Sequence, residues 1–264
     1  MAIAGRAVQF DLNTFEIMMY RSFVGIVIVL GVAQLAGTLH EVRFTKFKTH
    51  VVRNLFHFSG QNLWFYAITV APLAQVVALE FTSPLWVALL APLLLGERLT
   101  LTRGLSVIIG FLGILIVAKP SGEMNIGILA AALAAVGFAG SIIFTKRLTR
   151  TESITCILFF LTTLQALFGV IASVVFGPVQ LPTIATAPWL FLIGCAGLMA
   201  HFCLTTALSY APAVIVIPFD FVRLPLIAVI GALLYGEPLE VSLLIGGLVI
   251  LGANYLNIWG ERPR

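Results

Sequence analysis

Four ionisable side chains lie inside long apolar stretches, where a charge is costly and usually serves a function. They are Arg21, Glu80, Asp220 and Arg223. The two carboxylates, Glu80 and Asp220, are each followed by a phenylalanine and could bind a cationic group or take up a proton. The alternative is that ion pairs neutralise these carboxylates. Asp220 and Arg223 are three residues apart and could pair on one helix face. Glu80 could form an ion pair with Arg21 of another helix.

Arg21 and a set of uncharged polar residues offer a second kind of chemistry. Arg21 would attract an anionic group in a central cavity, or its long side chain would reach the membrane interface. Asn54, His57 and Gln61 follow one another at intervals of three and four residues, which places them on one face of an apolar helix. His201 follows Gln61 at the same interval at which Asp220 follows Glu80. These side chains could hydrogen-bond a substrate or join neighbouring helices.

The composition excludes most classes of soluble protein. Of the 264 residues, 60% are hydrophobic and 10% are charged, whereas a soluble domain has about 25% charged residues. So few charges cannot cover a water-exposed surface, which excludes a soluble enzyme, a nucleic-acid-binding domain and a disordered chain. The expected partners are a lipid bilayer and a small-molecule metabolite, with no nucleic acid. The three cysteines have no metal-ligand or disulfide spacing, so no metal, cofactor or disulfide is predicted.

Nine apolar segments are candidates for membrane-spanning helices, which need about 20 residues for one crossing. With edges good to a few residues, they are 15–36, 54–70, 75–95, 104–118, 126–145, 154–176, 188–208, 213–235 and 242–259. We therefore predict an all-α protein, a polytopic membrane helix bundle with nine spans.

The distribution of lysine and arginine orients this bundle. If the spans alternate, the segments 37–53, 96–103 and 146–153 lie on the same side as the C-terminal tail. That side carries eleven of the 15 lysines and arginines, including Arg53 at the end of the first segment, and the other side carries two. Basic loops are enriched in the cytoplasm. The C-terminus is therefore predicted to be cytoplasmic and the N-terminus external, in a cytoplasmic (inner) membrane.

The sequence repeats weakly, at one constant interval along the chain. Ala71-Pro72 recurs as Ala211-Pro212, Glu80-Phe81 as Asp220-Phe221, and Gly96-Glu97 as Gly236-Glu237. The two Gly-Glu turns fall on opposite sides of the predicted membrane, and repeats of opposite topology are typical of secondary transporters that bind substrate between them. We predict two repeats, residues 1–122 with four spans and residues 123–264 with five. The first helix of the first repeat is expected to be missing.

Several stretches of the chain resemble the EamA-type family of the drug/metabolite transporter superfamily. They are residues 15–22, 65–67, 71–74, 81–85, 95–99, 110–113, 119–120, 218–225 and 236–237. The resemblance implies ten helices in two inverted five-helix repeats, with both termini in the cytoplasm. Within the superfamily the chain is similar to bacterial members proposed to carry riboflavin or S-adenosylmethionine. Arg21 lies in the first of these stretches, which favours a role in the cavity or in an ion pair.

These observations predict a secondary transporter that moves a small metabolite across the cytoplasmic membrane by alternating access, with proton coupling as an option. The predicted substrate-binding or coupling residues are Arg21, Gln61, Glu80, His201, Asp220 and Arg223. The sequence has no metalloprotease, P-loop or dinucleotide motif, so no enzyme activity is predicted. The alternative is a truncated, non-transporting membrane paralogue or one part of an oligomeric assembly, and a homodimer is left open.

Overall fold

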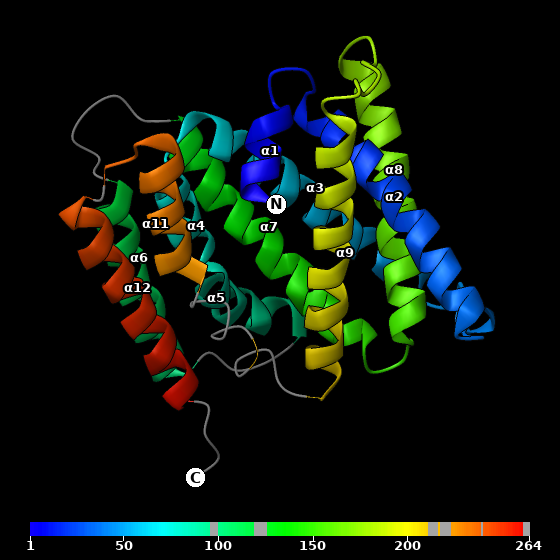
Figure 1. Cartoon of the computed structure of the whole chain (residues 1–264). Helices are drawn as coiled ribbons and strands as arrows, with labels where there is room; N and C mark the ends of the chain where they lie inside the picture. Colours follow the sequence, from blue (N-terminus) through cyan, green and yellow to red (C-terminus); the bar gives the residue numbers. More distant parts are fainter. Residues whose placement is uncertain (96–99, 119–125, 211–215, 217–222, 239, 261–264) are drawn as a thin grey trace. The chain divides into compact units, whose positions relative to one another are not determined.

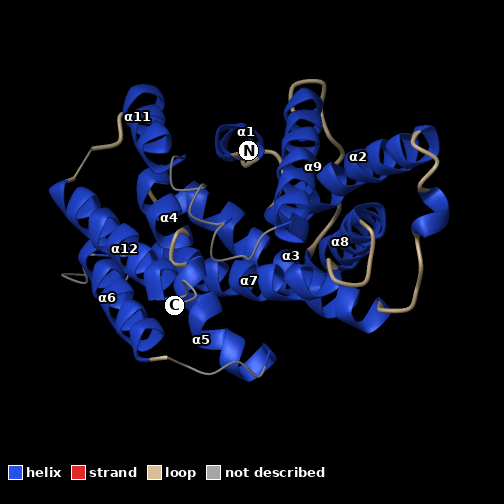
Figure 2. Ribbon diagram, turned by 90° about the horizontal axis from the view of Figure 1, so that it is seen from below, coloured by secondary structure: helices blue, strands red, loops and turns tan. Residues whose placement is uncertain are grey.

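The computed structural model describes residues 1–264 except 96–99, 119–125, 211–215, 217–222, 239 and 261–264 (Figure 1). The described residues form helices and loops, with no strand among them (Figure 2). In chain order the elements are α1 (Ala2–Val8), α2 (Thr14–Leu35), the 3-10 turn η1 (Leu39–Glu41), α3 (Phe47–Val70), α4 (Leu73–Glu80), α5 (Ser83–Leu95), α6 (Leu101–Ala118), α7 (Ile126–Leu148), α8 (Ile154–Phe176), α9 (Ala187–Tyr210), α11 (Arg223–Tyr235) and α12 (Val241–Gly260).

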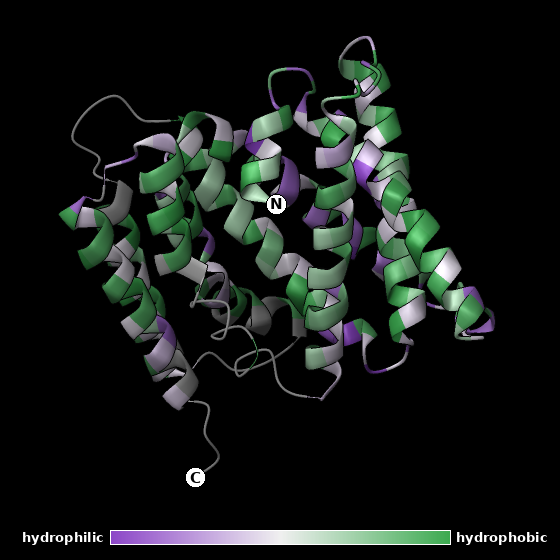
Figure 3. Cartoon of the chain, in the orientation of Figure 1, coloured by the Kyte–Doolittle hydropathy of each residue, from purple (hydrophilic) through white to green (hydrophobic). Residues whose placement is uncertain are grey.

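Four of these helices, α2, α7, α8 and α9, are long and apolar enough to cross a membrane. Shorter apolar helices lie within 73–87, 104–116, 226–235 and 241–256. Hydrophobic residues occupy most of the length of the helices (Figure 3), and large apolar side chains are widely exposed, as at Val175 and Leu233. Exposed apolar surface of this extent is typical of helices that face lipid. The chain is therefore an all-α bundle of membrane-type helices, and the number of nine spans stays a prediction.

Most of the predicted segments match helices closely, and 154–176 has the same bounds as α8. The first part of the predicted segment 213–235 lies almost entirely outside the described residues, and α11 covers the rest of it. Two other segments differ. Helix α3 begins at Phe47 instead of residue 54, and the segment 75–95 is divided into α4 and α5. In addition, the short helix α1, which the apolar pattern did not predict, precedes α2 and buries Ala4 and Val8.

The break between α4 and α5 has a local cause in Pro84. In a continuous helix the backbone N–H of residue 84 would donate to the carbonyl of Glu80, but proline has no N–H. Two hydroxyl groups donate to backbone carbonyls at the break. Ser83 Oγ donates to Glu80 O at 2.6 Å, and Thr82 Oγ1 donates to Leu79 O at 2.6 Å. The sequence 82–84 therefore ends one helix and starts the next within an apolar segment.

The bounds of the helices recur at the interval that the sequence repeat has. Helix α3 covers 47–70 and α9 covers 187–210, while α5 covers 83–95 and α11 covers 223–235. The two helices of each pair have the same length and are offset by the interval that separates Ala71 from Ala211. The N-caps of α2 and α8, Asn13 and Ser153, are offset by that interval too. The side chain of Asn13 accepts from two backbone N–H groups of its helix, and that of Ser153 accepts from one.

The chain divides into two compact units. The first contains Met1–Phe65 and Phe144–Tyr210, and the second contains Tyr66–Ile143 and Ala211–Arg264. Each unit therefore takes helices from both halves of the sequence. The predicted repeats, 1–122 and 123–264, are units of sequence that interleave in these compact units, and they stay a prediction.

In the first unit, α2 packs along α8 at glycine positions that let the helices approach closely. A Cβ atom on Gly169 would lie 2.8 Å from the Cα atom of Met19, and one on Gly25 would lie 2.7 Å from Thr162 Cγ2. Helix α9 packs against both α2 and α8, and α1 packs on α9. Small residues are what allow such close contact between membrane helices.

We expect Gly169→Ala to destabilise the protein by about 1–3 kcal/mol, because the added methyl group meets the backbone of α2, which cannot move aside. Thermal unfolding in detergent measures this effect as a lower Tm. The matched control is Gly31→Ala in α2, where an added Cβ meets nothing within 4 Å. Equal Tm values for the two variants would contradict the close contact.

In the second unit, α6 packs along α12, and α4 packs against α11. Two polar contacts hold the ends of α4. Asn254 Nδ2 in α12 donates to Phe81 O at 3.0 Å, and Glu237 Oε2 accepts from the backbone N of Leu73, the first residue of α4, at 2.8 Å. The Gly-Glu turn of the second half of the sequence therefore caps a helix of the first half.

Candidate functional site

A cluster of polar side chains lies among the helices of the first unit. We call it the polar cluster, and its members are Arg21 of α2, Arg53, Asn54 and His57 of α3, Gln165 of α8 and His201 of α9. Arg21 is 7% exposed and Arg53 is 1% exposed, although both are charged. Burying such groups in an apolar bundle is costly unless they are hydrogen-bonded or meet an opposite charge. The cluster is therefore the first candidate for a functional site.

Asn54 is the hydrogen-bonding centre of one half of the cluster. Its Oδ1 atom accepts from Arg53 Nη1 at 2.9 Å and from Gln165 Nε2 at 3.1 Å. Its Nδ2 atom donates to the backbone oxygens of His50 and Phe160, at 2.9 and 3.2 Å. Because these partners lie on α3 and α8, the Asn54 side chain joins the two helices. It has the role of an interhelical contact, which was one of the two interpretations of the polar stripe.

A chain of nitrogen atoms forms the other half of the cluster. Arg21 Nη2 lies 3.4 Å from His57 Nε2, and His201 Nε2 lies 3.2 Å from the same atom. Since a guanidinium group only donates, His57 Nε2 must accept from it, and a neutral His201 then carries its proton on Nε2. This assignment follows from the hydrogen-bond network. It leaves His201 Nδ1 as an acceptor, and that atom is buried without a partner.

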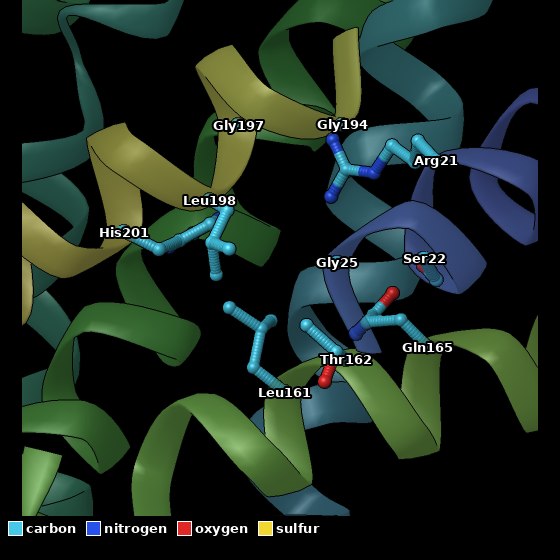
Figure 4. A pocket seen from close by; sticks show the side chains of 10 residues that line it. All are labelled: Arg21, Ser22, Gly25, Leu161, Thr162, Gln165, Gly194, Gly197, Leu198 and His201. Atoms are coloured by element: carbon cyan, nitrogen blue, oxygen red, sulfur yellow. The ribbon is translucent and has the colours of Figure 1, made fainter. Parts of the chain in front are cut away.

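A small pocket opens beside the nitrogen atoms of Arg21 and His201. Its lining comes from α2, α8 and α9: Arg21, Ser22, Gly25, Leu161, Thr162, Gln165, Gly194, Gly197, Leu198 and His201 (Figure 4). The free volume is about 20 Å³, enough for one or two water molecules. Three lining residues have a buried polar atom without a hydrogen bond, namely the donor Arg21 Nη1 and the acceptors Gln165 Oε1 and His201 Nδ1.

The charges of the cluster are unbalanced. Arg21 and Arg53 are close enough for their positive charges to interact, and neither forms an ion pair with a carboxylate of the described residues. Two buried guanidinium groups without a counter-charge favour the binding of an anion. The arrangement of one free donor and two free acceptors is complementary to an anionic group that has a hydrogen-bond donor next to it.

The six predicted site residues are placed differently. Arg21 and His201 lie together in the polar cluster, and both line the pocket. Gln61 is buried one turn of α3 beyond His57. Glu80 is half-buried at the end of α4, directly before the break, in the second unit. Asp220 lies outside the described residues, and Arg223 is the first residue of α11.

Two members of the cluster are not predicted from the sequence. Arg53 ends a basic segment, which predicts a cytoplasmic loop, and this prediction is wrong. Residues 47–53 form the first two turns of α3, which carry Arg53 into the bundle beside Thr145, to which its Nε donates at 3.1 Å. The spacing of Arg53, His57 and Gln61 is helical, and this signal could have found it. Gln165 stands alone in an apolar helix and has no such signal.

The fold and the cluster define a class of protein: a multi-pass membrane helix bundle with a polar site among its helices. A family model described as the EamA-like transporter family matches residues 1–119 and 125–259. The chain belongs to the EamA-like transporter family, and it is a small-metabolite transporter, not an enzyme.

Several relatives are named transporters. A riboflavin transporter of Brucella anthropi is 32% identical over 243 residues, covering 90% of this chain and 85% of the relative. An S-adenosylmethionine uptake transporter of Rickettsia bellii is 27% identical over 252 residues, covering 95% and 86%. A riboflavin transporter of Vibrio cholerae is 28% identical over 259 residues, covering 96% and 86%. One crystal structure, 16% identical, aligns over 97% of this chain and 93% of that one with a TM-score of 0.66, which shows a shared fold.

Proposed function

We propose that the protein is a secondary transporter that works by alternating access and binds the anionic part of its substrate at the polar cluster. The observation that carries this proposal is Arg21, a buried guanidinium group with one unpartnered nitrogen at a pocket. An uncompensated buried cation is hard to explain as a structural contact, because removing its charge would stabilise the fold. A transported anion that visits the site gives the charge a function.

The size of the pocket supports a mechanism with moving helices. A free volume of about 20 Å³ does not hold a metabolite, so α2, α8 and α9 must separate before a substrate enters. Inverted repeats provide such motion in secondary transporters. The helix bounds that recur at the interval of the sequence repeat, and the two separate segments matched by the family model, support two repeats of this kind here. Most lysines and arginines lie on the predicted side of the C-terminus, which supports a cytoplasmic membrane with a cytoplasmic C-terminus.

The chemistry of the pocket favours one class of substrate among those that the relatives carry. S-adenosylmethionine, named for the Rickettsia relative, has an α-carboxylate beside an α-ammonium group. The free donor of Arg21 suits the carboxylate, while Gln165 Oε1 and His201 Nδ1 suit the ammonium group. Riboflavin has no carboxylate. We therefore propose a metabolite with an amino-acid head group as the substrate.

Uptake of radiolabelled S-adenosylmethionine, amino acids and riboflavin into proteoliposomes tests this proposal. We expect uptake of a substrate with an amino-acid head group that unlabelled compounds with the same head group inhibit and that riboflavin does not. Uptake of riboflavin alone would contradict the proposed substrate class. Absence of uptake for every compound, with folded protein in the membrane, would also contradict the proposed substrate class.

Proton coupling is tested in the same vesicles. We propose that Glu80 and Asp220 take up the proton, since a broken membrane helix such as α4–α5 places a carboxylate where coupling ions bind in transporters. Glu80→Gln and Asp220→Asn are expected to reduce proton-driven accumulation at least tenfold while substrate exchange continues. The matched control is Glu41→Gln in η1. Unchanged accumulation in both carboxylate variants would exclude their role in coupling.

A further inference from the structure

A second group of ligand atoms gathers in the first unit, and none of its residues lines the pocket. His50 lies in the first turn of α3, Glu152 lies in the loop before α8, and Cys156 lies in the first turn of α8. One ligand atom of each lies within 4.8 Å of the other two. Cys156 Sγ is 3.3 Å from Glu152 Oε2 and 4.0 Å from His50 Nε2. The side chains of His50 and Cys156 are buried and that of Glu152 is half-buried.

We propose that His50, Glu152 and Cys156 bind a zinc ion. Thiolate, imidazole and carboxylate are the three ligand types that zinc uses in proteins, with metal–ligand distances of about 2.0–2.3 Å. In a tetrahedron of that size, ligand atoms are separated by about 3.5 Å. The separations from Cys156 Sγ, 3.3 and 4.0 Å, are close to this value. Magnesium and calcium prefer ligand sets made of oxygen atoms. The thiol therefore makes the site selective for zinc over these two ions.

The charges of the three ligands fit a divalent ion. One thiolate, one carboxylate and one neutral imidazole together carry two negative charges, which balance the charge of zinc in a partly buried place. The proton of the Cys156 thiol leaves for the solvent when the metal binds.

The surroundings of the site hold the ligands in position. Thr45 Oγ1 donates to Glu152 Oε1 at 2.9 Å, which leaves Oε2 turned toward the thiol. Such hydrogen bonds to the outer atom of a ligand are common in zinc sites. A water molecule that reaches the site from the half-buried side of Glu152 would be the fourth ligand. The ion would tie the start of α3 to the start of α8, and the backbone oxygen of His50 bonds to Asn54 of the polar cluster.

The test uses the full chain in detergent, stripped of metal and with any affinity tag removed. Cobalt reports on the ligands, because a thiolate bound to Co²⁺ gives a charge-transfer band in the near ultraviolet. We expect this band at one equivalent of Co²⁺ and its loss when one equivalent of Zn²⁺ is added. A wild-type protein without the band would overturn the proposal, whatever the variants do.

Variants then locate the site. Zinc affinity, measured by competition with a chromogenic chelator, is expected to fall at least tenfold in Cys156→Ser and in His50→Gln. The matched controls are Cys203→Ser and His40→Gln, which change an exposed cysteine and an exposed histidine outside the site. They should bind zinc as the wild type does. Unchanged affinity in Cys156→Ser, or an equal loss in Cys203→Ser, would place the metal elsewhere and overturn the assignment.

Discussion

Replacing Arg21 by glutamine is expected to reduce the initial rate of substrate uptake at least a hundredfold while leaving the protein as stable as the wild type or more stable. The guanidinium group is 7% exposed, and its Nη1 atom has no hydrogen-bond partner among the described residues. A charged hydrogen bond to a substrate anion in such a place contributes about 2–5 kcal/mol. Removing an uncompensated buried charge, in contrast, relieves the fold of a desolvation cost.

The combination of lost transport and kept stability separates a binding role from a structural one. Uptake into proteoliposomes measures the first quantity and Tm in detergent the second. Arg21→Lys keeps the charge but loses the planar fork, so it should retain a small part of the activity. The matched control is Arg150→Gln, an exposed arginine in the loop before α8. If Arg21→Gln lowers Tm by several degrees and keeps its uptake, Arg21 is a structural residue.

The apolar helices of this protein could be predicted because contact with lipid demands continuous apolar sequence. The segment 154–176 and helix α8 coincide for this reason. Pro84 is visible in the sequence, but whether proline bends or breaks a helix depends on which groups donate hydrogen bonds to the carbonyl oxygens at the break. Here Thr82, Ser83 and the distant Asn254 supply them. A contact from α12 cannot be read from the sequence around residue 84.

The polar cluster could be predicted only in part, and its charged members show why. Arg21 is recognisable because it stands inside an apolar run, while Arg53 is not because it closes a basic segment that resembles a loop. The difference between a loop and the first turns of a helix depends on the burial of the residues, and burial depends on tertiary packing. The proposed zinc ligands depend on tertiary packing even more strongly. His50 and Cys156 are 106 residues apart, and only the packing of α3 on α8 brings them together.

Replacing Asn54 by leucine is expected to lower the stability of the protein by about 2–4 kcal/mol and to abolish uptake. The side chain of Asn54 is buried, and its two polar atoms bond to four groups. Leucine has a similar volume, so packing changes little, but Arg53 Nη1 loses a partner in an apolar interior. The cost of leaving a buried polar group unpaired is about 1–3 kcal/mol, and more for a charged group.

Asn62 in the same helix provides the matched control for this prediction. It is 7% exposed, but its Nδ2 atom bonds only to the backbone of its own helix, at Phe58 O, and its Oδ1 atom is buried without a partner. Asn62→Leu should therefore leave Tm unchanged or raise it. A large loss of stability in Asn62→Leu and none in Asn54→Leu would contradict the central role of Asn54. Asn54 also joins α3 to α8 and positions Arg53. Its loss should therefore separate α3, which carries His57, from the helices that line the pocket.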